Sequence, residues 1–387
     1  MPSKKTTIAK RIAISLGAIA LAVTMGLQTA SLVIERSTPD VALQLNPKNG
    51  KALSRKAFQD FSLLVAEGRT PEEAAQEVAD TARQALRYEP LLPQAHAILA
   101  LAADTREKRK AILEPALKLN RRSATLLGLS LQEELADENI EGVITTLDQI
   151  LRVHPETSAD FFPLLAGALV DDQALPIFQR ILASKPPWQD RFLVTASANP
   201  EAVVNVAKLR REVIVENENL DSALIARLAD AEEFGAAQQH YEFLEKRFPR
   251  DISMALRSQY PPLDWKFSDT REKRSQLSRD GNAIEIFVRP GAGGVIMDRI
   301  VAVKDGQVDV SIAYDFGQSA QIANIRLQAN CPGSSSLLIV QSFEEAKGTM
   351  RLQVPASECD FMRLALYARV PSGRPALRGS ISNFTVK

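Results

Sequence analysis

Apolar residues recur three and four positions apart from about residue 70 to residue 257, which is the spacing of one buried helix face. No run in this stretch alternates apolar and polar residues as a half-buried strand does. Thr70-Pro71-Glu72-Glu73 predicts a helix start, with threonine as cap, proline in the first turn and glutamate three residues after the cap. Pro39 fits the first turn of an earlier helix, with Thr38 as its cap. Much of the first two-thirds of the chain is therefore predicted to be helical.

A short signature recurs in this helical stretch: an apolar helix end, a polar residue and then proline. Five of its copies close at Pro47, Pro90, Pro155, Pro186 and Pro249. A sixth copy has Arg121 at the closing position instead of proline. The 34 residues from Arg121 to Pro155 and the 31 residues from Pro155 to Pro186 are the spacings of a two-helix repeat. The remaining 63 residues before Pro249 leave room for two degenerate units. Such repeats stack into a solenoid, which usually holds other molecules.

After Tyr260-Pro261-Pro262 the period of the pattern changes to two, which is typical of strands. About eight strands are predicted, separated by glycine, proline and aspartate turns: residues 284–288, 294–303, 308–316, 323–329, 336–341, 350–354, 362–367 and 379–386. Eight short alternating strands predict a two-sheet antiparallel β-sandwich of the jelly-roll kind.

The N-terminus predicts a single membrane anchor. Lys4, Lys5, Lys10 and Arg11 precede an uncharged run of 23 residues at 12–34, long enough to cross a hydrocarbon core of about 30 Å. Positive charge before the run places the N-terminus in the cytoplasm and the bulk of the chain outside it. The alternative is a cleaved signal peptide, but the run is longer than a usual signal core and Gln28-Thr29-Ala30 is a poor cleavage site.

These patterns predict a multidomain α and β fold. The expected parts are a cytoplasmic basic flank (1–11), a transmembrane helix (12–34), α-helical repeats (35–260) and a β-sandwich (261–387). The 47 basic residues balance the 47 acidic ones, which argues against a general nucleic-acid partner. Three histidines and two cysteines are too few for a dedicated zinc site built on those ligands. No metal and no other cofactor is expected.

The two cysteines, Cys331 and Cys359, each end a predicted strand of the sandwich. A disulfide is expected between them if the domain lies outside the cytoplasm, and two buried thiols are the alternative. No residues are expected to be catalytic: the segment Arg289–Gly294 lacks a following Gly-Lys-Ser/Thr, and acidic pairs such as Glu72 and Glu73 fit solvated helix faces.

One set of side chains predicts a glycan-binding site. Alternation places Arg326, Arg351, Arg363 and Tyr367 on outer strand faces of the sandwich. Guanidinium groups can grip the carboxylate or pyruvate groups of a polymer, and an aromatic ring can lie against a sugar. The alternative is an ordinary solvated sheet face.

The helical stretch resembles the tetratricopeptide family over roughly residues 40–255. The units Ala174, Phe178, Ile181, Pro186 and Ala237, Tyr241, Leu244, Pro249 have that family's spacing of small, aromatic and apolar residues. Ala57, Ala100 and Ala196 each lie ten residues after a closing proline, where the family has a small residue. An irregular helical bundle without true repeats is the alternative.

The whole layout resembles a group of bacterial envelope proteins that carry an anchor, tetratricopeptide-like repeats and a sandwich with two cysteines. The segments that carry this resemblance are Leu263–Phe267, Ile325–Cys331 and Val354–Leu364. It implies an inner-membrane-anchored, periplasmic, non-enzymatic scaffold in polysaccharide production or cell-envelope assembly. The repeats would bind a protein partner, and the sandwich a polysaccharide or a second partner. The alternatives are a carbohydrate-binding module on a helical stalk and an enzyme acting on envelope glycans.

Overall fold

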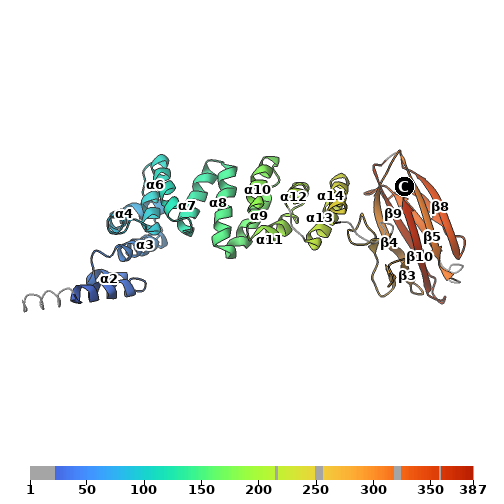
Figure 1. The fold of residues 1–387 in the computed structure, drawn as a ribbon, viewed down its shortest axis with the longest axis horizontal. Helices are drawn as coiled ribbons and strands as arrows, with labels where there is room; N and C mark the ends of the chain where they lie inside the picture. Colours follow the sequence, from blue (N-terminus) through green and yellow to red (C-terminus); the bar gives the residue numbers. More distant parts are fainter. Residues whose placement is uncertain (1–21, 214–216, 249–255, 318–323, 357–358, 387) are drawn as a thin grey trace, which may run out of the picture. The chain divides into compact units, whose positions relative to one another are not determined.

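The computed structural model describes residues 22–213, 217–248, 256–317, 324–356 and 359–386. The chain forms two compact units, Met1–Ala159 and Asp160–Lys387. Helices make up the described part of the first unit and the beginning of the second, and two β-sheets complete the second (Figure 1).

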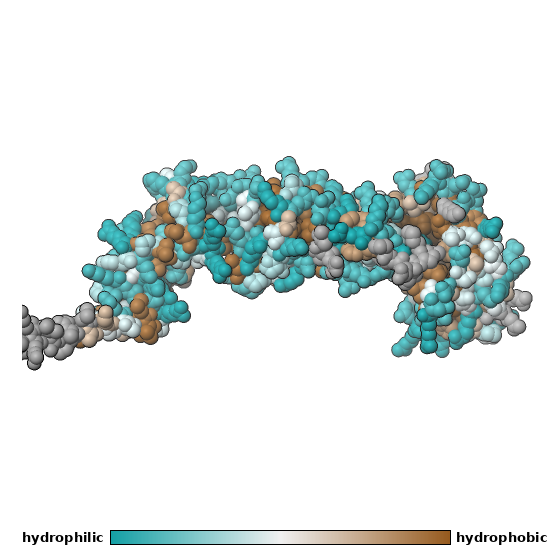
Figure 2. All heavy atoms as spheres, viewed as in Figure 1, coloured by the Kyte–Doolittle hydropathy of each residue, from teal (hydrophilic) through white to brown (hydrophobic). Residues whose placement is uncertain are grey.

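Helices follow one another with short connections from residue 22 to residue 247. An apolar helix spans Ala22–Ile34. The others are α2 (Pro39–Leu45), α3 (Gly50–Ala66), α4 (Pro71–Tyr88), α5 (Pro93–Leu101), α6 (Arg106–Leu119), α7 (Ala124–Ala136), α8 (Ile140–Val153), α9 (Ser158–Ala168), α10 (Leu175–Ala183), α11 (Gln189–Ala196), α12 (Val203–Glu212), α13 (Glu218–Asp230) and α14 (Phe234–Arg247). Hydrophilic residues cover most of the helical surface visible in Figure 2.

The expected helix starts are largely confirmed. Thr70 caps α4: its side chain accepts from the N–H of Glu73, and the Glu73 side chain accepts from the N–H of Thr70. Pro39 opens α2 as expected, but the Thr38 side chain accepts no capping hydrogen bond, and its hydroxyl donates to the carbonyl of Ile34 at 3.5 Å. The predicted cap at Thr38 is therefore wrong in its hydrogen bond, although the helix begins where expected.

The recurring signature marks the ends of alternate helices. Each copy closes within a few residues of the end of α2, α4, α6, α8, α10 or α14. Ala57, Ala100 and Ala196, the small residues expected where helices approach closely, are all fully buried. Alanine at such buried positions permits close approach of two helix backbones.

In the part of the chain that the structure describes, no single helix is long and apolar enough to cross a membrane. Two segments, Pro155–Ala168 and Asp172–Ala183, reach the required length and hydropathy only together, and they are bent by 113°. Residues 12–21 of the predicted transmembrane segment 12–34 lie outside the described residues, and residues 22–34 form the apolar helix Ala22–Ile34.

The β region contains two five-stranded antiparallel sheets. Their strands are β1 (Lys266–Phe267), β2 (Lys273–Leu277), β3 (Ile284–Val288), β4 (Gly293–Ala302), β5 (Gln307–Asp315), β6 (Asn324–Asn330), β7 (Leu337–Ser342), β8 (Lys347–Pro355), β9 (Phe361–Arg369) and β10 (Leu377–Val386). Sheet A has the order β1-β4-β9-β6-β7, and sheet B has the order β2-β3-β10-β5-β8.

The strand order of β3 to β10 is that of a jelly roll, because the chain passes from one sheet to the other at almost every connection. One apolar core fills the space between the sheets, built from alternate residues of both. Trp265 lies fully buried in it against Phe384, with ring centroids 4.5 Å apart. The two short strands β1 and β2 were not predicted.

A polar contact joins α14 to the segment that leads into the sandwich. The Tyr241 hydroxyl donates to Oδ1 of Asp264 at 2.8 Å, and the backbone N–H of Tyr260 donates to Oδ2 at 2.9 Å. Asp264 is 0% exposed, so these donors replace the water it would otherwise bind. Arg299 lies beside this pair, with its guanidinium 5.5 Å from the Trp265 ring and donating to the carbonyl of Leu263.

Candidate functional site

Three of the four predicted glycan-binding residues share the outer face of sheet A. Arg326 on β6 and Tyr367 on β9 are direct cross-strand partners, and the guanidinium carbon of Arg326 lies 4.3 Å from the Tyr367 ring centroid. Arg363 lies four residues before Tyr367 on the same strand, so its side chain leaves the same face. Its Nε donates to Oδ2 of Asp298 on β4 at 2.9 Å.

The fourth predicted residue, Arg351, lies on the other sheet. It belongs to β8, the edge strand of sheet B, and its cross-strand partner is Ser311. The three predicted arginines therefore do not share one sheet face. Alternation fixes the side on which each side chain leaves its strand, but the sheet to which a strand belongs depends on long-range pairing.

The outer face of sheet B carries a groove that the sequence did not predict, here called the Phe287 groove. Its volume is about 580 Å³, and it is lined by Arg274, Gln276, Glu285, Ile286, Phe287, Arg378, Gly379 and Ser380. These residues come from β2, β3 and β10, which are neighbours in the sheet. Strand register arranges the outward side chains in two rows.

The first row of the Phe287 groove places an aromatic ring between two arginines. Arg274 on β2 and Arg378 on β10 are both cross-strand partners of Phe287 on β3. The guanidinium carbon of Arg378 lies 4.9 Å from the Phe287 ring centroid. Arg274 donates from its Nε to Oδ1 of Asp269 at 2.9 Å, so the guanidinium is held in place from outside the groove.

The second row supplies polar groups to the same groove. Gln276 and Ser380 are the cross-strand partners of Glu285 on either side. The Gln276 amide donates to Oε2 of Glu285 at 3.1 Å, which orients both side chains. An amide, a carboxylate and a hydroxyl thus lie together two residues along the strands from Phe287, and all three can bind sugar hydroxyl groups.

The sequence contained one signal for this groove, but the alternation within a single strand does not show which strands pair. Phe287 interrupts the outward polar positions of β3 with an aromatic residue, which is half-buried in the structure. Arg274 and Arg378 lie 104 residues apart in the chain, and only the pairing of β3 with both β2 and β10 brings them together.

A second groove lies in the first unit, between α6, α7 and α8. Its volume is about 780 Å³, and its lining includes Lys118, Arg121 and Arg122. Within the described ranges none of these three cations forms an ion pair. Glu114, Glu134 and Glu141 also line the groove, so that its walls carry charges of both signs.

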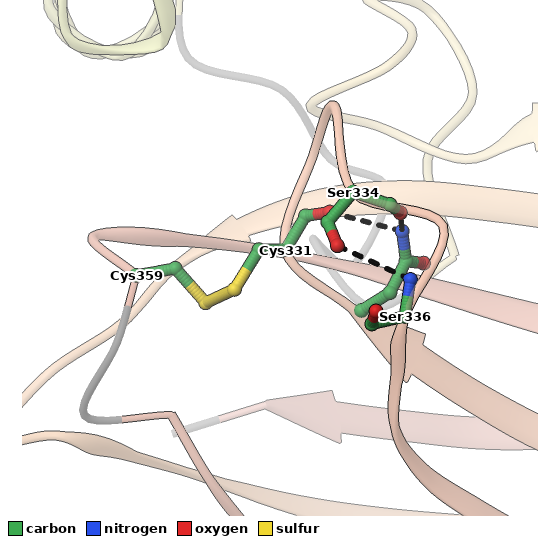
Figure 3. The surroundings of a disulfide bond; sticks show 5 residues. Cys331, Ser334, Ser336 and Cys359 are labelled. Atoms are coloured by element: carbon green, nitrogen blue, oxygen red, sulfur yellow. Dashed lines mark hydrogen bonds between the residues drawn. A yellow bond between two sulfur atoms is a disulfide. The ribbon is translucent and has the colours of Figure 1, made fainter.

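Cys331 and Cys359 form the expected disulfide, with their Cα atoms 5.9 Å apart (Figure 3). The bond ties the end of β6 to the start of β9, which are neighbouring strands of sheet A. The turn after Cys331 is closed by the N–H of Ser334, which donates to the Cys331 carbonyl at 3.1 Å, and by the N–H of Ser336, which donates to the Ser334 hydroxyl at 3.1 Å.

A buried polar cluster in the helices of the second unit has a structural role. Arg210 on α12 donates to Oδ2 of Asp221 on α13 at 2.9 Å, and His240 on α14 lies 3.3 Å from Oδ1 of the same carboxylate. All three residues are almost fully buried. Burial lowers the pKa of His240 below its usual 6.5, and the nearby Asp221 carboxylate only partly offsets this.

The described residues contain no group of three or more histidine, cysteine, aspartate or glutamate side chains placed to hold a metal ion.

No protein-family model and no curated protein sequence matches this chain. Solved structures are similar to part of it. One, described as "CBM4 structure and function", is 10% identical, covers 34% of this chain and 92% of its own, and has a TM-score of 0.26. TmCBM61 in complex with β-1,4-galactotriose is 13% identical, covers 32% of this chain and 87% of its own, and has a TM-score of 0.24. The accessory secretory protein 1, 2 and 3 structure from Streptococcus pneumoniae is 9% identical, covers 30% of this chain and 85% of its own, and has a TM-score of 0.21. Similarity at this level carries no conclusion about function.

Proposed function

We propose that the β-sandwich binds a glycan and that the chain is a non-enzymatic, membrane-anchored scaffold facing the periplasm. The scaffold would act in polysaccharide production or in cell-envelope assembly. The observation that carries glycan binding is the Phe287 groove, where an aromatic ring lies next to planar donors and to hydroxyl-binding groups on three adjacent strands. An apolar ring with a few convergent polar groups is the usual composition of a small-molecule site.

The lining of the groove favours binding over hydrolysis. Glycosidases of most families use a pair of carboxylates that flank the bond to be broken. Among the described residues that line the Phe287 groove, Glu285 is the single carboxylate, and the Gln276 amide already donates to it. This supports a binding module over the alternative of a glycan-active enzyme.

Binding is tested with the full-length chain in a detergent that carries no sugar headgroup. Electrophoresis through gels that contain neutral or acidic polysaccharides should retard the chain in at least one polymer. Phe287→Ala should abolish this retardation, whereas Tyr367→Ala on the opposite sheet should preserve it. Retardation that is lost with Tyr367→Ala and kept with Phe287→Ala would move the site to sheet A.

A protein partner for the helical repeats is the second part of the proposal. The groove between α6, α7 and α8 supports it, because Lys118, Arg121 and Arg122, which form no ion pair with any described residue, can pair with an acidic segment. In a pull-down from envelope extracts, Arg121→Glu/Arg122→Glu should lose a partner that the wild type retains. Equal recovery of every partner by both proteins would refute this use of the groove.

The membrane anchor rests on the basic flank and the apolar run at 12–34. A reporter that works only outside the cytoplasm, fused after Lys387, should be active, and the protein should stay in the membrane fraction after alkaline extraction. An active cytoplasmic reporter would contradict the topology, and a soluble form that starts near Ser31 would favour a cleaved signal peptide.

A further inference from the structure

The Phe287 groove has a feature that a site for neutral sugars does not need. Two guanidinium groups, one on each side, flank a single aromatic ring. Arg274 and Arg378 belong to strands on opposite sides of β3, about 10 Å apart across the sheet. Both face solvent, and both are cross-strand partners of the same residue. Their long side chains can therefore reach a common point above Phe287.

The partners of these arginines leave donors available. Arg274 uses its Nε to hold Asp269, so its terminal nitrogens are not occupied by that bond. Arg378 lies against the Phe287 ring and, in the described chain, makes no ion pair with an acidic residue. A guanidinium that lies over an aromatic ring keeps its N–H groups directed away from its own face, where a carboxylate can accept two of them.

We propose that the Phe287 groove binds a polysaccharide whose sugars carry carboxylates, with one carboxylate between Arg274 and Arg378. This inference rests on the proposed glycan binding and names the class of glycan. The hydroxyl groups of the same sugar lie over the second row, where Glu285 accepts and Gln276 and Ser380 complete the contacts.

The spacing of the two rows fits one acidic pyranose ring. Residues two apart on a strand are about 7 Å apart, and this separates the arginine row from the Glu285 row. A uronate ring carries its carboxylate at one end and its free hydroxyls at the other. The negative end meets the arginines, and Glu285 meets hydroxyl donors; in the reversed orientation the ligand carboxylate would face the Glu285 carboxylate and be repelled.

The outer face of sheet A fits an anionic sugar less well. Arg326 lies on Tyr367 with its Nε buried and without a partner in the described parts of the chain. Arg363 donates from its Nε to Asp298, as Arg274 does to Asp269, but it is not a cross-strand partner of Tyr367. Among the described residues of the two sheets, it is on sheet B that two exposed guanidinium groups share one cross-strand aromatic partner. The predicted preference for a carboxylated polymer is kept, but its proposed place moves from Arg326, Arg351, Arg363 and Tyr367 to the Phe287 groove.

The test uses the full-length chain in sugar-free detergent and calorimetric titration with defined oligosaccharides. The acidic probes are oligogalacturonate, oligomannuronate and hyaluronan oligomers, and the neutral probes are methyl esters of the same oligomers. We expect at least one acidic probe to bind and its ester to bind at least about 10-fold more weakly, because the charge-assisted hydrogen bonds are lost. Arg378→Gln should weaken the acidic probe by a similar factor, and Arg351→Gln, on the same sheet but outside the groove, should change it less than about 2-fold.

The outcomes separate this inference from the proposed function. If an ester binds as tightly as its acid and still requires Phe287, the glycan-binding function stands and the carboxylate inference is overturned. If binding of the acid survives Arg378→Gln and Arg274→Gln together, the assigned contact is overturned. If no probe, acidic or esterified, binds the wild type, the inference that carboxylated sugars bind in the Phe287 groove fails.

Discussion

Tyr241→Phe tests the polar contact that joins α14 to the sandwich. The substitution keeps the aromatic ring, which is 4% exposed, and removes only the hydroxyl that donates to Asp264. Oδ1 of Asp264 is left without this donor in a fully buried position. Loss of a hydrogen bond to a charged buried acceptor costs roughly 1.5–3 kcal/mol, and we expect the second unit to lose that much stability.

The measurement is urea unfolding followed by tryptophan fluorescence. Trp188 and Trp265, the two tryptophans of the chain, both lie in the second unit, so fluorescence reports on that unit alone. Tyr314→Phe is the matched control, because Tyr314 is also buried and its hydroxyl has no hydrogen-bond partner among the described residues. It should change the free energy of unfolding by less than about 0.5 kcal/mol.

The pH dependence gives an independent check of the same contact. Burial, together with the nearby Asp264 carboxylate, raises the pKa of Tyr241 above its usual 10.0. Above that pH the unfolded chain releases the phenolic proton before the folded chain does, so stability falls as pH rises. Wild type should therefore lose stability above pH 10 more steeply than Tyr241→Phe. A change of less than about 0.5 kcal/mol at neutral pH, with identical alkaline profiles, would refute the role of this hydrogen bond.

Three further predictions concern stability. Replacing Cys331 and Cys359 with serine opens a 28-residue loop and should cost about 3–4 kcal/mol in urea unfolding, and an unchanged midpoint would contradict this. His240 is held neutral by burial among Asp221, Arg210 and Arg211, so stability should fall as pH drops below 6.5. His240→Gln should weaken that fall in midpoints measured between pH 7.5 and 5.5, and equal slopes would argue against it. Gly379→Ala would place a Cβ 2.8 Å from the Asp315 carbonyl oxygen and from the Phe316 ring. The substitution should therefore lower the melting temperature and reduce the free energy of unfolding by about 1–3 kcal/mol. An unchanged melting temperature would contradict the close approach.

The helical part could be predicted in detail because its signals are local. The capping box at Thr70 and the signature that ends alternate helices depend on residues a few positions apart, and the structure confirms both. The buried alanines Ala57, Ala100 and Ala196 follow from the same spacing. Thr38 shows the limit, since its hydroxyl competes for a nearby carbonyl that the pattern does not reveal.

The sandwich could be predicted as far as its strands and its disulfide. Alternation correctly separates buried Leu327 and Leu364 from outward Arg326 and Arg363. It does not tell which strands pair, so it could not show that Arg351 lies on the opposite sheet from Arg326 and Arg363. The two short edge strands were missed because Lys266–Phe267 is too short to alternate and Lys273–Leu277 is mostly polar.

The same limit explains why the Phe287 groove was missed. Its two rows are built by register across β2, β3 and β10, and each strand alone presents only one or two of its groups. Phe287 on an outward position was the one local signal, and it gains meaning only when an arginine lies on either side.

Hydroxyl-radical footprinting of the full-length chain, with and without the tightest-binding acidic oligosaccharide, tests the central claim most directly. Phe287 and Tyr367 are both reactive aromatic residues, and they lie on opposite sheets. The account predicts that saturating ligand lowers the oxidation rate of Phe287 and leaves that of Tyr367 unchanged. Protection of Tyr367 without protection of Phe287, or no protection of either residue under conditions in which the ligand is bound, would contradict it.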